Sequence, residues 1–400
     1  MPDTAPRLQS TDPAVSRRSP RAVRPFFGLI DAVIAPGPAG FDFDGGIAEP
    51  HAQAAWTWMV RDVAPDLIDT GVSDEDPAAR QALDLLMPEL LQRSRAALAA
   101  ITTPEAERRM QIQFGSDDGF RRLPVVLNAL KCRSLLDKAQ AFGRAANAMT
   151  DETALGVALQ SMPLNDHAVS ALLFQAAMGQ VTHPGRLMAA AIRLAGSATE
   201  GSLQRAGFAP LIEAILSHAQ AQIPALDQHG AFADIDLTCR AIDRFHRLMR
   251  AVTGYVELGR LTRWSTAVAA VTKTVSELVE PKLREVSPNV NLALRRHSGT
   301  DRLDSDQVLA ALNGCYVLAT IRDCRDSLAL NAMFDQTWTQ VGQALEMHVQ
   351  RNLELFRQNP GDRVTGARLD AAIKMAELRF NPDYADVLRR ARETAEKRAS

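Results

Sequence analysis

Residues 334–356 read FDQTWTQVGQALEMHVQRNLELF, a run without proline in which apolar residues return every three or four positions. A helix turns once in about 3.6 residues, so this spacing places the apolar residues on one face. The stretch therefore predicts a long amphipathic helix that buries a single stripe of side chains. The stripe consists of Phe334, Trp338, Val341, Leu345, Val349, Leu353 and Phe356.

A second run of the same kind lies between Pro224 and Pro281, while the first lies between Pro288 and Pro360. In the run between Pro224 and Pro281, the apolar spacing is interrupted near Gly254 and Gly259 and then resumes, which predicts a kink, a register shift or a break between two helices. The positions that share the rhythm are Ile242, Phe245, Met249, Val252 and Val256, followed by Leu261, Trp264, Val268, Val271, Val275 and Leu278.

The composition extends this interpretation to the whole chain. Apolar residues make up 46% of it and aromatic residues only 5%, and much of the apolar content is alanine and leucine, which favour helix. No strand-length alternation of β-branched residues is apparent. Three apolar helix starts between residues 120 and 225 recur about 40 residues apart, close to the period of helical repeats. We predict an all-α chain, either a multi-helix bundle or an irregular α-solenoid, with long amphipathic helices in its C-terminal half.

Local composition divides the chain into three predicted regions. Residues 1–25 are rich in proline, serine and arginine, and we expect a disordered basic arm there. Residues 26–230 are expected to form an N-terminal helical region, and residues 231–400 a C-terminal bundle of long helices.

Charge and cysteine content restrict the function. A net charge of −2 gives no general attraction to nucleic acid or to an anionic membrane. The four cysteines are far apart and form no C-x-x-C pair, so we expect free thiols and a cytoplasmic protein. No apolar run approaches the roughly 20 residues of a membrane helix. The excess of arginine over lysine, with abundant alanine, is typical of a GC-rich bacterial genome.

One short motif suggests catalysis. Residues 41–46, Phe-Asp-Phe-Asp-Gly-Gly, resemble the first motif of the haloacid-dehalogenase-like phosphatases. The resemblance implies that Asp42 is the nucleophile and Asp44 the acid or base, beside a Mg²⁺ ion. The chain departs from the family pattern, because residues 35–40 are rich in proline and glycine and Gly46 replaces the usual threonine or valine. The alternative is a turn whose aspartates cap the backbone and whose phenylalanines dock on the core.

A carboxylate and an imidazole are also spaced for contact on a predicted helix. Asp243 and His246 are three residues apart, so their side chains can touch. Such a pair can act as a base or bind a metal ion, but a metal site in a helical bundle needs ligands from several helices. We favour a surface hydrogen-bonded pair, and we predict no catalytic residue, no metal ligand and no cofactor.

The strongest functional prediction is a docking segment near the N-terminus, where positive charge is followed by an apolar face. It has three possible roles: packing on the protein's own body with its arginines toward the acidic stretch 41–76, docking into a partner protein, or contact with an anionic membrane. The segment consists of Arg17, Arg18, Arg21, Arg24, Phe26, Phe27, Ile30, Val33 and Ile34.

Together these patterns predict a non-catalytic helical interaction or scaffold protein. Its partner would be another protein or a second copy of the chain, bound through seam residues such as Trp338, Val341 and Leu345. We expect no nucleic-acid partner. Two alternatives remain: an enzyme whose site is assembled from distant residues on different helices, and a peripheral membrane or secretion-associated factor that uses the basic arm.

Overall fold

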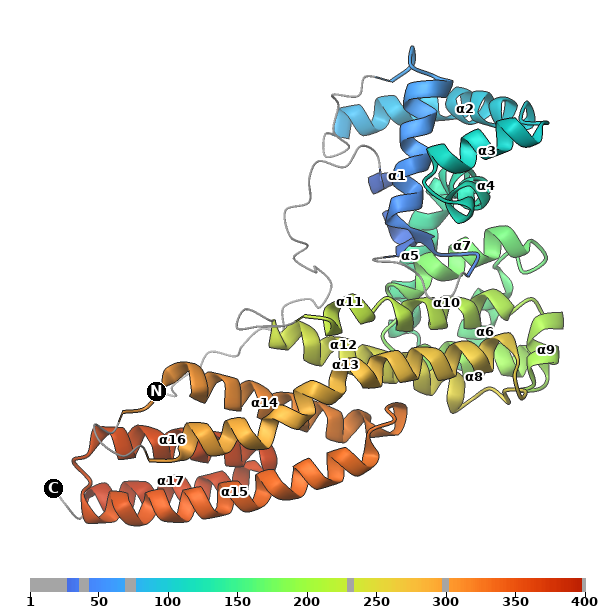
Figure 1. Ribbon diagram of the computed structural model, residues 1–400. Helices are drawn as coiled ribbons and strands as arrows, with labels where there is room; N and C mark the ends of the chain where they lie inside the picture. Colours follow the sequence, from blue (N-terminus) through green and yellow to red (C-terminus); the bar gives the residue numbers. More distant parts are fainter. Residues whose placement is uncertain (1–26, 36–42, 69–76, 229–233, 297–301, 398–400) are drawn as a thin grey trace, which may run out of the picture. The chain divides into compact units, whose positions relative to one another are not determined.

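The computed structural model describes residues 27–35, 43–68, 77–228, 234–296 and 302–397 (Figure 1). The predicted arm, residues 1–25, lies outside the described residues. The remainder is all-α, as predicted, and its only β-structure in the described ranges is a pair of two-residue strands and one isolated bridge between Thr199 and Glu257.

Contacts divide the chain into two units. Unit 1 comprises residues 1–38 and 42–183, and unit 2 comprises residues 39–41 and 184–400. The sequence placed a boundary near residue 230, which falls inside unit 2. Helices α11 (Ile223–Leu226) and α12 (Ile235–Thr253) lie on either side of that position and contact each other, so both belong to one folded body.

Unit 1 buries one apolar core between α1, α2, α4, α5 and α7, with the short turns η1 and η2 packed against it. The elements are η1 (Phe27–Leu29), η2 (Asp31–Val33), β1 (Ile34–Ala35), β2 (Ile47–Ala48), α1 (Glu49–Trp58), the π-helical turn η3 (Met59–Val63), α2 (Pro77–Ala99), α3 (Pro104–Gln113), α4 (Asp117–Lys131), α5 (Arg133–Ala148), α6 (Glu152–Gln160) and α7 (His167–Met178).

The strand pair was not anticipated. The apolar residues after Phe26 form two 3₁₀ turns and then β1, which pairs in parallel with β2. Ile34 and Ile47 are partners in this register. The short turns are enough to bury Ile30 and Val33. The strand pair then provides hydrogen-bond partners for part of the backbone that follows.

In unit 2 the longest helices are α13 and α15, drawn in yellow and orange in Figure 1. α13 contacts α14 and α15, α15 contacts α16, and α17 packs on α15 and α16. The further elements are α8 (Pro184–Ala195), α9 (Glu200–Arg205), α10 (Ala209–Gln220), α13 (Arg263–Leu294), α14 (Ser305–Cys324), η4 (Arg325–Ser327), α15 (Asn331–Gln358), α16 (Arg363–Arg379) and α17 (Pro382–Lys397).

The apolar stripe of residues 334–356 is confirmed as the buried face of α15. Val341 and Leu345 are 0% exposed, and Phe334 and Phe356 are also buried. The predicted use of Val341 and Leu345 as an exposed seam for self-association is therefore wrong. The periodicity that identified them is the signature of a face buried inside the protein's own bundle.

The break near Gly254 and Gly259 is confirmed, since α12 ends at Thr253 and α13 begins at Arg263. One position of the predicted stripe is misplaced. Leu261 lies in the connection, has a positive φ of 57° and is 95% exposed. Its agreement with the helical rhythm was coincidental, because the helix had not yet begun.

Helix α13 continues through Pro281 and Pro288, which the sequence suggested as limits. Each proline lacks the N–H that would bond to the carbonyl four residues earlier. Both prolines lie on the exposed side of α13, where water can satisfy those carbonyls. The buried stripe continues across them through Val279, Leu283 and Val286, and its packing keeps the helix intact.

Candidate functional site

The described part of the docking segment belongs to the core of unit 1. Ile30 is 2% exposed and Val33 is 0% exposed, and Ile34 packs against the same core. Phe27 begins η1. The side chains of Ile30, Val33 and Ile34 therefore help to stabilise the fold of unit 1 itself. Arg17, Arg18, Arg21, Arg24 and Phe26 lie outside the described residues.

The phosphatase-like motif is a turn that packs against α7. Phe43 is buried, and the N–H of Gly46 donates to the carbonyl of Phe43. A Cβ on Gly45 would lie 2.2 Å from the carbonyl oxygen of Ala171, so only glycine permits this approach. Asp42 lies outside the described residues. Within the described ranges no long strand carries the motif, and the resemblance supports no phosphatase assignment.

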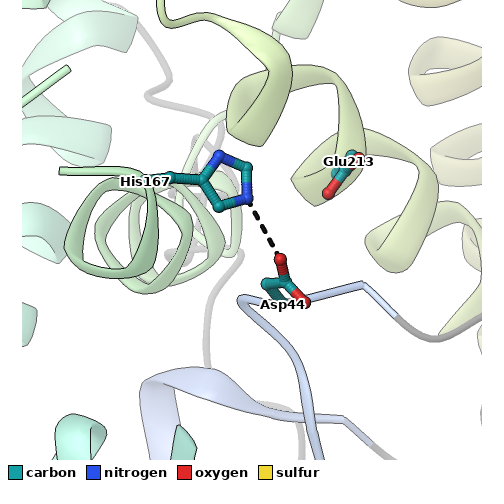
Figure 2. A group of neighbouring side chains, drawn as sticks. All are labelled: Asp44, His167 and Glu213. Atoms are coloured by element: carbon teal, nitrogen blue, oxygen red, sulfur yellow. Dashed lines mark hydrogen bonds and ion pairs between the residues drawn. The ribbon is translucent and has the colours of Figure 1, made fainter. Parts of the chain in front are cut away.

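Asp44 on this turn contacts His167 on α7 (Figure 2) and Arg122 on α4. One carboxylate oxygen lies 3.0 Å from Nε2 of His167, at the start of α7, and the other lies 3.7 Å from Nη1 of Arg122 on α4. The side chains of Asp44 and His167 are about half exposed, at 48% and 52%, whereas that of Arg122 is 8% exposed. A carboxylate that orients an imidazole is a common acid–base arrangement.

Sequence reasoning did not identify this group. Asp44 was noted only within its motif, and no spacing linked it to His167 or Arg122. A second carboxylate–imidazole pair joins α4 to α1. Asp118, one turn before Arg122 on α4, lies 3.7 Å from Nε2 of His51 on α1. These contacts arise from packing between segments far apart in the chain, so a local pattern could not reveal them.

Glu213, also drawn in Figure 2, belongs to unit 2. It lies on α10 and is 6% exposed. One carboxylate oxygen accepts from Nη1 of Arg263 at 3.1 Å and from the indole N–H of Trp264 at 3.3 Å. These bonds attach α10 to the first turn of α13, a structural role.

The predicted pair on α12 does not form. Asp243 forms an ion pair with Arg247, and Nδ1 of His246 lies 2.9 Å from the hydroxyl of Ser327. Each side chain therefore has a different partner, and neither arrangement gathers metal ligands. Both partners were compatible with the sequence, but only the position of η4 brings Ser327 to the imidazole.

The cysteines of α14 are suited to packing rather than to nucleophilic chemistry. All four cysteines are free, as expected. Burial raises the pKa of Cys315 and of Cys324 to about 12, so both remain protonated at neutral pH. A thiol acts as a nucleophile or metal ligand in its thiolate form, which these sites disfavour.

Within the described part of the chain, one face of α14 carries apolar side chains that no other element covers. The helix packs mainly against α12, α13 and α16, and it also contacts α15 and η4. The remaining side carries Leu309, which is 54% exposed, the partly buried Leu312, and Tyr316, which is 42% exposed. We call Leu309, Leu312 and Tyr316 the α14 face. Their spacing of three and four residues aligns them along the helix.

No known family matches this chain, and no curated protein or solved structure is similar to it. Among the described residues, none of the helices combines the length and apolarity needed to cross a bilayer.

Proposed function

We propose that this chain is a non-catalytic helical interaction protein and that the α14 face is where it binds a partner protein. The observation that supports this proposal most strongly is the distribution of apolar residues around α14. Leu309 and Tyr316 lie on the outer side of the helix, while Ala311, Leu318 and Ile321 fill the inner side. A helix that is apolar on all sides is normally buried on all sides.

Exposed apolar residues are common singly, but here three occur in line on one helix. Fully burying a leucine side chain stabilises a complex by about 1.5–3 kcal/mol before the costs of association are subtracted. The α14 face therefore supplies enough apolar surface for a binding anchor without any change in the fold of unit 2.

The spacing and charge of the α14 face favour a particular partner. Leu309, Leu312 and Tyr316 follow the i, i+3, i+7 pattern with which helices bind one another. Exposed carboxylates, Asp306 and Asp323, lie toward the two ends of the face. An amphipathic helix with one apolar side and basic residues flanking it would complement both features.

Site-specific photo-crosslinking in the native cell tests the proposal. A photoreactive residue at position 309 or 316 is expected to crosslink one protein, and Leu312→Asp should abolish the product. Met347 provides a matched control, because it lies on α15 and is 56% exposed, close to the 54% of Leu309. Equal crosslinking at position 347, or none at 309 and 316, would refute the proposal, and a product between two copies would show self-association.

A second function is supported by the Asp44–His167 pair. An imidazole held by a carboxylate and half exposed can serve as a general acid or base, and its residues come from distant parts of the sequence. The test is a panel of ester and phosphoester substrates with wild-type protein and with His167→Gln. Turnover lost in the variant would support an enzyme, and turnover that is absent or unchanged would exclude this role.

A further inference from the structure

The C-terminal bundle holds two arginines against one tryptophan. Trp338 on α15 is partly exposed, and Cζ of Arg379, the last residue of α16, lies 3.8 Å from a ring centroid of its indole. Cζ of Arg322 on α14 lies 5.6 Å from the ring. Both distances fall within the range of cation–π attraction, so three helices bring two positive charges to one aromatic surface.

The position of Arg379 is fixed by its surroundings. Its Nε donates a hydrogen bond of 2.8 Å to the carbonyl oxygen of Trp338. One turn further along α15, a Cβ on Gly342 would lie 2.8 Å from Nη2 of Arg379, so the glycine leaves room for the guanidinium. Phe334 stacks on Trp338 with ring centroids 5.5 Å apart and holds the indole in place. The guanidinium is thus already ordered, which lowers the cost of binding a ligand.

The charge of Arg379 is poorly compensated. Within the described part of the chain, no carboxylate lies within salt-bridge distance of it, and the carbonyl of Trp338 is its hydrogen-bond acceptor. Burial lowers the pKa of Arg379, the negative charge of Glu346 raises it, and the positive charge of Arg322 lowers it. A half-buried cation beside a like charge is electrostatically unfavourable unless an anion accompanies it.

Arg322 is available to share such an anion. It pairs with its neighbour Asp323, but the two side chains are 45% and 67% exposed. Exposed ion pairs between adjacent residues contribute little and exchange readily. A ligand can therefore recruit Arg322 without breaking a buried contact.

We propose that Arg322 and Arg379, beside Trp338, form a binding site for an oxyanion, the phosphate or carboxylate group of a ligand. Guanidinium groups present paired N–H donors that match the oxygens of both groups, and charge-assisted hydrogen bonds of this kind are strong. This site is separate from the α14 face and does not depend on the function proposed for that face.

Titration with inorganic phosphate, and in parallel with acetate, tests the site by calorimetry and by the NMR signals of the Trp338 indole and Arg379 Nε groups. Binding of phosphate alone identifies a phosphate site, and binding of acetate identifies a carboxylate site. We expect Arg379→Gln to weaken binding at least about tenfold. Arg357→Gln, an exposed arginine on α15, is the matched control and should bind as wild type.

A purely structural role for Arg379, fastening α16 to α15, makes different predictions. It predicts that Arg379→Gln lowers the stability of the protein and that Arg322→Gln and Glu346→Gln leave anion affinity unchanged. Our proposal predicts weaker binding for Arg322→Gln and tighter binding for Glu346→Gln, because the second removes a nearby negative charge. Unchanged affinity in both variants, or no binding of either anion by wild-type protein, would overturn the proposal.

Discussion

Helices α14 and α15 are neighbours in the sequence and in the bundle of unit 2, yet they use their apolar residues differently. On α15 the apolar residues form one stripe, and Val341 and Leu345 on that stripe are completely buried. On α14 they surround the helix, and Leu309 and Tyr316 remain exposed. The regular apolar stripe of α15 therefore identifies its buried face. On α14, where the apolar residues form no single stripe, some of them remain on the surface.

The largest expected effect is on the buried stripe of α15. Leu345→Ala should lower the free energy of unfolding by about 3 kcal/mol, because it removes buried methyl groups and leaves a cavity. Urea denaturation followed by circular dichroism measures the change. Met347→Ala, two residues away but exposed, is the control and should change stability by no more than about 0.5 kcal/mol. Similar losses in both variants would contradict the division between the two faces of α15.

The buried side of α14 should show a pH dependence that its exposed side lacks. Burial holds the pKa of Cys315 and Cys324 at about 12, well above the ordinary thiol value of 9.0. Above pH 9 the unfolded thiols lose protons that the folded thiols retain, so stability should fall as the pH rises from about 9 toward 12. The measurement is urea denaturation across this range.

Other groups also titrate in that range, so the comparison requires a variant. Cys315→Ala combined with Cys324→Ala should start less stable at pH 7 and lose less stability on going to high pH. If the two proteins lost stability in parallel, burial of the thiols would not be the cause.

The smallest effect on stability is expected on the α14 face. Leu309→Ala should change the free energy of unfolding by no more than about 0.5 kcal/mol, because the side chain is largely exposed in the folded state. In contrast, the same substitution should weaken capture of the partner identified by crosslinking. A large loss of stability would show that Leu309 belongs to the core and would remove the contrast with α15.

The fold class could be predicted because it depends on local patterns. The apolar stripe of α15 and the break after α12 follow from helical spacing and glycine placement. Helix starts also depend on local contacts, since the side chains of Thr103, Asp304 and Asn381 each accept a backbone N–H near the start of a helix. The prediction that Pro281 and Pro288 limit the helical runs was wrong, because α13 continues through both prolines. Packing of its buried stripe outweighs the cost of two missing hydrogen bonds.

The sites could not be predicted in the same way. From the sequence, the apolar residues of the docking segment were compatible with the protein's own core, with a partner or with a membrane, and the structure places Ile30 and Val33 in the core of unit 1. A sequence shows that a segment is amphipathic, not which surface covers its apolar side. Likewise, His167 had no recognisable partner until the turn that carries Asp44 was placed beside it.

The sequence by itself determined that this protein is helical, where most of its long helices lie and which residues of α15 are buried, because hydrogen bonding and side-chain periodicity within a helix are local. Tertiary structure alone decided that Arg322 and Arg379 meet at Trp338 and that one face of α14 stays uncovered. Those arrangements depend on how three or more helices pack. Contacts between distant residues follow from the shape and charge of every surface involved, which no single stretch of sequence contains.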